Sequence, residues 1–181
     1  MINIKYLVGG DMNLLELKRK EKMINNFENI KECLQFENNL YDLYGKGGIE
    51  KKVCDHLKSF SLRKRGSLRY EQYVTKARIS DENAYPCFSK AVYEDFMVCL
   101  EVYEELVCVN GHANRIRRKM NEKGIGKTLV DMVGSKSKKD SFLKLEAKRL
   151  LDYSMESVVV RNFREFNAEL VSICREKLGM K

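Results

Sequence analysis

Residues 124–128, with the sequence GIGKT, come closest to a motif that carries chemistry. Phosphate-binding loops follow the pattern G-x-x-x-x-G-K-[ST], in which backbone amides and the lysine hold the phosphates of a nucleotide. The leading glycine of that pattern would stand at position 121, which is Asn121. The preceding residues have helical spacing, and no apolar strand ending in aspartate follows to hold magnesium. The segment therefore does not predict a nucleotide site.

Acid–base, nucleophilic and metal chemistry need several polar side chains that converge in one cleft. The six cysteines, at positions 33, 54, 87, 99, 108 and 174, form no C-x-x-C pair, and His56 and His112 are isolated. This spacing does not match a zinc site. The carboxylates fall on the outer faces of predicted helices. We therefore expect no enzyme, no metal and no cofactor.

Basic side chains dominate the segment 115–127, which carries six of them against Glu122 alone. With a net charge of +8, this run could contact phosphates. It has no interleaved aromatic residues on which single-stranded bases could stack, so a solvated basic face is an equal alternative. The candidate nucleic-acid contacts are Arg115, Arg117, Arg118, Lys119 and Lys123.

Apolar residues recur with helical spacing along most of the chain, and no segment alternates as a strand would. The spacing predicts helices within 11–34, 40–44, 49–60, 67–78, 88–109 and 159–173, with a basic turn at 63–66 and a polar loop at 80–86. Three further helices are predicted over 115–154, with joints at Gly124 and Gly134. The chain is therefore expected to be all-α, an irregular right-handed, HEAT-like bundle or stack of seven to nine helices.

At 181 residues, the chain suits one domain with a short extension. We expect a partly helical N-terminal extension at 1–38 and a single core domain at 39–181, acting as a monomer. No stretch approaches the roughly 20 apolar residues of a membrane span. The apolar run at 6–8 is too short for a signal peptide. A soluble, intracellular protein with reduced cysteines is expected.

The acidic helix at 88–109 offers a candidate binding surface. Lys90, Tyr93 and Met97 lie along one side of it. If that side is the wall of a groove, it would accept an amphipathic or extended peptide. Equally, Tyr93 and Met97 could be ordinary core residues, and the spacing does not separate the two interpretations.

The phrase EKGIGKTLVDMV, the lysine-rich loop after it and the phrase LEAKRLLDYS resemble the helical N-terminal domain of transcription elongation factor TFIIS and its relatives. Within that group, the chain is most similar to the conserved core of the interacts-with-Spt-six family. The GKGG segment at 45–48, the loop at 80–86 and the FSK phrase at 88–90 match this family in the same order. The resemblance covers about residues 40–158. The usual tryptophan is replaced by Tyr153 or Ser154, and the family's long tails are missing.

This resemblance implies a non-enzymatic transcription elongation adaptor in the nucleus. Its core would bind a disordered segment of the histone chaperone Spt-six and link it to RNA polymerase II and chromatin. By motif position, the resemblance implies a peptide groove lined by Lys90, Tyr93 and Met97, with the adjoining turn shaped by Gly124, Ile125, Gly126 and Lys127. The alternative is a basic helical domain that binds nucleic acid. The two differ in salt dependence, which is steep for contacts to phosphates.

Overall fold

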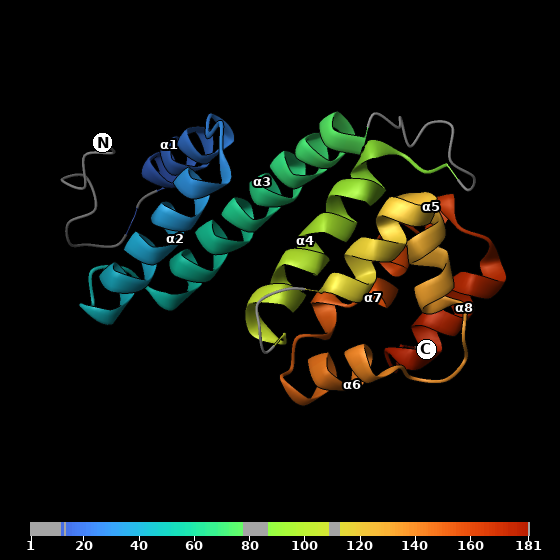
Figure 1. The fold of residues 1–181 in the computed structure, drawn as a ribbon. Coiled ribbons are helices and arrows are strands. Elements are labelled where there is room, and N and C mark those ends of the chain that lie inside the picture. The colour runs from blue at the N-terminus through green and yellow to red at the C-terminus, as the bar shows by residue number, and fades with distance from the viewer. Residues whose placement is uncertain (1–11, 13, 78–86, 109–112, 181) are drawn as a thin grey trace. The chain divides into compact units, whose positions relative to one another are not determined.

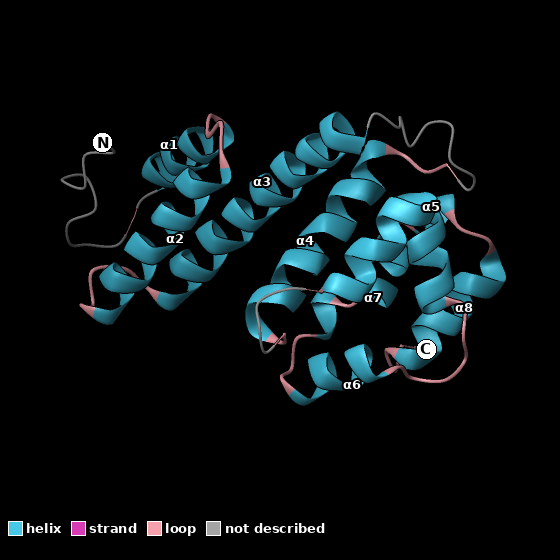
Figure 2. Ribbon diagram, in the orientation of Figure 1, coloured by secondary structure: helices cyan, strands magenta, loops and turns pink. Residues whose placement is uncertain are grey.

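The computed structural model describes residues 12, 14–77, 87–108 and 113–180. All regular secondary structure in these ranges is helical, with no strand (Figures 1 and 2), so the predicted all-α class is confirmed for the described residues. The loop predicted at 80–86 and His112 lie outside the described residues. The α-helices are α1 (Leu14–Asn25), α2 (Ile30–Gly45), α3 (Lys51–Ala77), α4 (Lys90–Leu106), α5 (Asn114–Val133), α6 (Asp140–Ala147), α7 (Met155–Arg161) and α8 (Ala168–Lys177).

The chain divides into two compact units, Met1–Leu68 and Arg69–Lys181, and α3 contributes residues to both. The boundary expected between residues 38 and 39 falls inside α2. A helix that packs as one piece cannot be split there, because its apolar face is continuous. Cys33, Phe36 and Leu40 on α2 are all buried in the core of the first unit.

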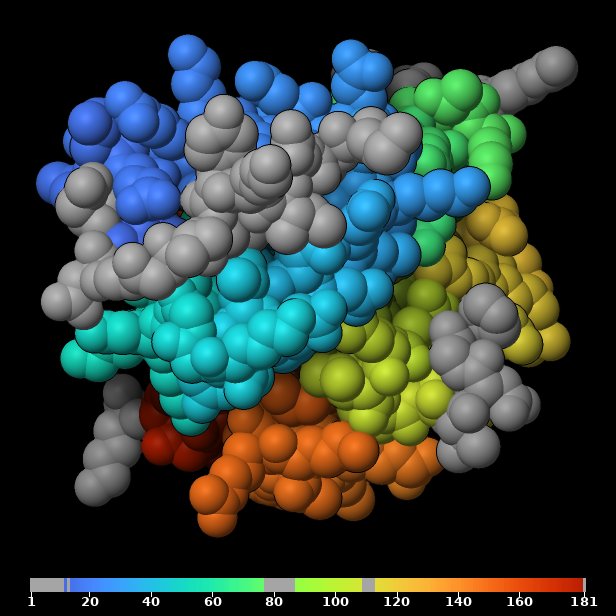
Figure 3. Space-filling model, turned by 90° about the vertical axis from the view of Figure 1, so that its left-hand side faces the viewer, coloured from blue at the N-terminus to red at the C-terminus, as the bar shows by residue number. Residues whose placement is uncertain are grey.

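In the first unit, α1, α2 and the first part of α3 enclose a core of large apolar side chains that includes Ile24, Phe27 and Leu57. A capping box begins α2, in which the Asn29 side chain accepts from the Glu32 amide and the Glu32 carboxylate accepts from the Asn29 amide. This reciprocal pair satisfies amides that a helix start leaves open. The α2 surface of this unit is visible in Figure 3.

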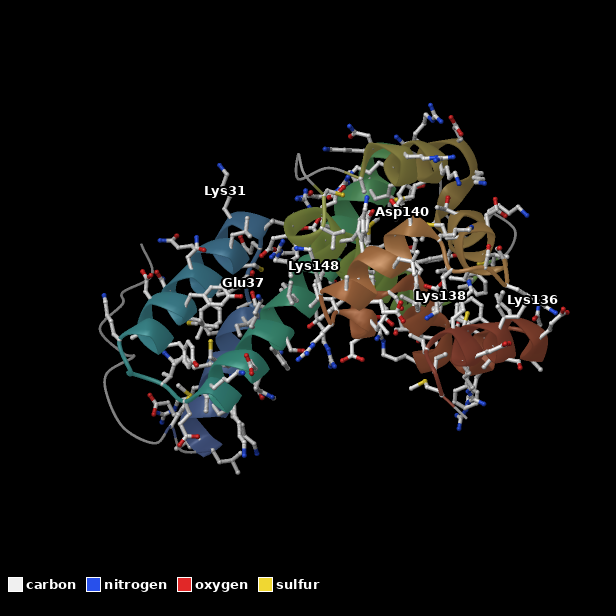
Figure 4. The ribbon with its side chains drawn as sticks, turned by 90° about the horizontal axis from the view of Figure 1, so that it is seen from below. Lys31, Glu37, Lys136, Lys138, Asp140 and Lys148 are labelled. Atoms are coloured by element: carbon white, nitrogen blue, oxygen red, sulfur yellow. The ribbon has the colours of Figure 1, made fainter. Side chains whose placement is uncertain are left out.

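The sequence predicts a basic turn at 63–66 between two helices, and this prediction is wrong. The helix α3 runs through these positions for 27 residues. Arg65 does not face solvent: its Nη1 lies 2.8 Å from Oε2 of Glu37, and both side chains are only 4% exposed. A buried arginine matched by a carboxylate lets the helix continue where the charge pattern suggested a turn. Glu37 is labelled on α2 in Figure 4.

In the second unit, α4 supplies most of one core face. Phe96, Cys99 and Leu100 are almost fully buried, and residues of α5, α7 and α8 pack against them. The helix is shorter than the predicted span of 88–109, and α3 exceeds it in length. A buried ion pair joins α7 to α8, with Nζ of Lys177 at 3.1 Å from Oε1 of Glu156. The same ammonium donates to the carbonyl of Val133 at the end of α5.

Candidate functional site

Two of the three groove residues predicted on α4 belong to the core. Tyr93 is 2% exposed and Met97 is 3% exposed. The Tyr93 ring stacks on Tyr70 with ring centroids 5.5 Å apart, and its hydroxyl accepts a hydrogen bond from the Phe88 amide. The burial of both side chains supports the interpretation that Tyr93 and Met97 are core residues. It corrects the interpretation that Tyr93 lines an open groove, whereas Met97 borders a hollow between α3, α4 and α5 with only a small part of its surface.

Lys90 is separated from that core and lies on the surface. Its Nζ is 3.7 Å from a carboxylate oxygen of Glu71 and 3.5 Å from one of Glu94. Its side chain is 60% exposed, so these pairs are weak. The structure therefore does not bring Lys90 together with Tyr93 and Met97 on one surface.

Gly124 interrupts α5, as the sequence predicts. Its backbone has φ 78° and ψ 166°, a conformation outside the helical region that residues with a side chain rarely adopt. The hydroxyl of Thr128 donates to the Gly124 carbonyl at 2.7 Å, one turn back along the helix. Gly126 is buried and Ile125 is fully buried, whereas Lys127 is exposed and pairs with Asp131. The predicted turn is therefore a kink between the two halves of α5, and most of its residues are buried and not available to a partner.

The kink places residues of both halves of α5 around one hollow. Ile116 and Met132 are sixteen positions apart in the sequence. On a straight helix, with about 100° per residue, they would point roughly 160° apart. Both nevertheless line the same hollow. Gly124 is thus the residue that lets one helix supply two walls.

This hollow, which we call the α4–α5–α6 groove, has a volume of about 630 Å³, within the usual range for ligand sites. Its apolar surface comes from Tyr103, Ile116 and Met132. A smaller hollow of about 20 Å³ adjoins it and reaches Phe142 and Leu145. The remaining lining residues of the groove are Cys108, Ala113, Asn114, Arg115, Lys119, Lys139, Asp140 and Ser141.

The groove carries positive charge that the described residues leave without a carboxylate partner. Within the described ranges, Arg115 and Lys119 have no ion-pair partner. Asp140, the acidic residue in the lining, is paired with Lys144 at 2.8 Å. Burial, followed by the nearby charges of Lys119 and Lys177, lowers the pKa of Lys139 below its usual value. An anionic ligand would relieve this crowding of like charges.

The basic run predicted as a nucleic-acid contact is divided by the structure. Arg117 forms a bidentate pair with Glu104, and Arg118 pairs with Glu122 at 3.5 Å. Lys123 pairs with Asp131. Arg115 and Lys119 therefore remain as the run's unmatched cations among the described residues, and both line the α4–α5–α6 groove.

A second hollow lies on another side of α5. This α3–α4–α5 hollow has a volume of about 390 Å³ and also contains three basic residues. Two of them are already matched: Arg69 Nε lies 2.7 Å from Glu101, and Arg117 is held by Glu104. Its lining residues are Arg69, Gln72, Tyr73, Lys76, Met97, Arg117, Met120 and Asn121.

The groove residues missed by sequence reasoning are Tyr103, Met132 and Lys139. Tyr103 and Met132 belong to apolar stripes that were expected to be core, and both are half-buried at the groove. Lys139 is one of several lysines in the loop before α6. The local sequence does not set Lys139 apart from the other lysines of this loop, and only its neighbours in the folded structure do.

The described residues contain no helix that is long and apolar enough to cross a membrane. In the same ranges, no three His, Cys, Asp or Glu side chains gather as they would around a metal ion. In comparisons with known proteins, no family model, no curated protein and no solved structure matches the chain.

Proposed function

We propose that the protein is a non-enzymatic adaptor whose α4–α5–α6 groove binds an acidic, partly apolar peptide segment of a partner. One observation carries this proposal: the groove combines apolar lining residues with Arg115 and Lys119, two cations that have no ion-pair partner among the described residues. Apolar anchors in a groove supply affinity, and charges at its rim orient the partner and speed its approach.

The cellular role follows from the family resemblance of the sequence. We propose a transcription elongation adaptor in the nucleus, whose partner is a disordered segment of the histone chaperone Spt-six. Through that chaperone, the protein would be linked to RNA polymerase II and chromatin. The proposed arrangement is a HEAT-like helical stack followed by a bundle like the TFIIS N-terminal domain. The joint at Gly124, in the GIGKT segment on which the resemblance depends, is in keeping with this arrangement.

The proposal is tested by fluorescence anisotropy with a labelled peptide from the acidic, partly apolar N-terminal segment of Spt-six of the same organism. The double variant Arg115→Glu, Lys119→Glu should bind more than about tenfold more weakly, because two attractive charges become repulsive. Lys90→Glu is the control for a charge reversal elsewhere on the surface, since Lys90 lies outside the groove, and each groove residue changed singly to Glu matches its change in charge. Equal affinity of the double variant and the unaltered protein would contradict the proposal.

The same titration separates the peptide adaptor from a nucleic-acid-binding domain, the alternative supported by the exposed side chain of Arg115. Binding dominated by phosphate contacts falls steeply between low and moderate salt. A peptide held by apolar anchors should lose much less affinity over that range. Salt-sensitive binding to a random DNA duplex, with no peptide binding, would favour the alternative.

A further inference from the structure

Lys139 has an environment that differs from that of an ordinary surface lysine. It precedes the first residue of α6, its side chain is half-buried, and it lines both the α4–α5–α6 groove and the smaller hollow beside it. Its Nζ donates a hydrogen bond to the backbone carbonyl of Asp131 at 2.7 Å. The amine is therefore fixed in place at the edge of an open groove.

Charged groups face this amine from three packed helices. Lys119 on α5 and Lys177 on α8 oppose its protonation, while Glu156 on α7 and Asp131 on α5 favour it. Both carboxylates already have other partners: Glu156 is paired with the buried Lys177, and Asp131 with Lys123 and Lys127. Burial has the largest effect, and the pKa of Lys139 is lowered overall.

A lysine that is partly desolvated beside other cations has a larger neutral fraction, and the neutral amine is the nucleophile. The hydrogen bond to Asp131 is compatible with this role. A neutral amine keeps two N–H groups, so it can still donate to the carbonyl while its lone pair stays available. The groove gives a small electrophile access to that lone pair.

We propose that Lys139 is a preferred acylation site of this protein, with a phosphate-bearing acyl thioester such as acetyl-coenzyme A as the donor. The Nζ lone pair attacks the thioester carbonyl carbon, an N–C bond forms and the C–S bond breaks. The sulfur leaves as the thiolate and takes up the proton released by nitrogen, giving an amide and a thiol. Arg115 and Lys119 are placed in the same groove to attract the donor's phosphates.

Acylation would remove one positive charge from the groove. This consequence rests on the proposed function: if the groove binds an acidic peptide, the acylated protein should bind that peptide more weakly. Acylation itself does not depend on any peptide. Rapid acylation of Lys139 without an effect on peptide binding would therefore overturn the proposed function and leave the modification site standing.

The test is incubation of the full chain with acetyl-coenzyme A, followed by mass spectrometry of acetylation at each lysine over time. The matched control is Lys136, an exposed lysine in the same loop (Figure 4). We expect Lys139 to be acetylated about fivefold faster than Lys136. A rate equal to or below that of Lys136 would overturn the proposal.

A variant separates the effect of the neighbouring charges from simple exposure. Lys119→Met removes a cation that faces Lys139, and Lys119 is partly exposed, so the fold should tolerate the change. Acetylation of Lys139 by uncharged acetic anhydride should then slow about twofold or more, while that of Lys136 stays the same. If the acetylation rate of Lys139 is unchanged in the variant while helicity is preserved, Lys119 does not make Lys139 more reactive, which would contradict this part of the argument.

Discussion

The two hollows on either side of α5 contain the same number of basic residues but differ in how those charges are matched. In the α3–α4–α5 hollow, Arg69 and Arg117 are held by buried carboxylates. In the α4–α5–α6 groove, Arg115 and Lys119 have no such partner among the described residues. The number of cations that line a hollow therefore does not tell how many of them are already paired with carboxylates of the protein.

The difference arises within one turn of α5. Arg115 and Arg117 are two positions apart, so they point to different sides of the helix. Arg117 meets Glu104 of α4, whose carboxylate also accepts from the Ala113 amide at 2.8 Å. Arg115 faces the open groove instead. The first arginine is available to a ligand, whereas the second holds α5 against α4.

The largest effect is expected from Glu104→Ala, which removes the carboxylate that holds Arg117 of the α3–α4–α5 hollow. This change leaves the Ala113 amide without its acceptor and leaves the half-exposed Arg117 with the more distant carboxylate of Glu101, at 3.7 Å. The free energy of unfolding should fall by about 3 kcal/mol, because the buried Ala113 amide loses its acceptor and a partly exposed arginine loses its nearest carboxylate. Urea denaturation monitored by circular dichroism measures this change in the free energy of unfolding.

The control for this prediction is Asp140→Ala in the groove, where the side chain is 79% exposed and, in the described part of the chain, is paired only with the surface residue Lys144. Its free energy of unfolding should change by less than about 0.5 kcal/mol. Equal losses of unfolding free energy in the two variants would mean that Glu104 and Asp140 contribute equally to stability, which would contradict the comparison.

Gly124→Ala should have the next largest effect, because both hollows depend on the course of α5. An alanine at φ 78° and ψ 166° is strained by about 1–3 kcal/mol. If the helix straightens to relieve the strain, Met132 leaves the groove, and peptide affinity should fall with stability. Gly45→Ala, at an exposed position with nothing near an added Cβ, is the control.

How far the sequence predicts this molecule depends on whether the signal is local. Helical spacing predicts the all-α class, and Gly124 is correctly expected to interrupt a helix, because both follow from nearby residues. The prediction of a basic turn at 63–66 is wrong, because Arg65 is buried in an ion pair with Glu37, a residue that is far away in the sequence.

The candidate site could be predicted only in part. Arg115 and Lys119 belong to the basic run that the sequence already singles out. Tyr103 and Met132 could not be recognised as groove residues, since their spacing is that of a core stripe and only the packing of α4, α5 and α6 leaves them half-exposed. Tyr93 has the same spacing and is core.

A smaller effect should separate the two hollows in peptide binding. Lys119→Glu should weaken binding of the acidic peptide about tenfold, whereas Lys76→Glu in the α3–α4–α5 hollow should change it less than about twofold. Both are single charge reversals, so net charge is matched between the variants. Similar losses in anisotropy titrations would show that overall charge, and not the groove, attracts the peptide.

The smallest effect concerns Asp131, whose carboxylate pairs with Lys123 and Lys127 of the same helix. The hydrogen bond from Lys123, with a further contribution from Lys127, lowers the pKa of this carboxyl below its unfolded value of about 3.9. The stability that it contributes is therefore present above about pH 4 and is lost as the pH falls through the folded pKa. Because the pair is accessible to solvent, Asp131→Asn should lower the free energy of unfolding by only about 0.5 kcal/mol at pH 7. Urea titrations of both proteins at decreasing pH measure this difference, which should vanish at the lowest pH at which they remain folded. A difference that persists there would mean that Asp131 acts through packing or its backbone carbonyl rather than through its charge.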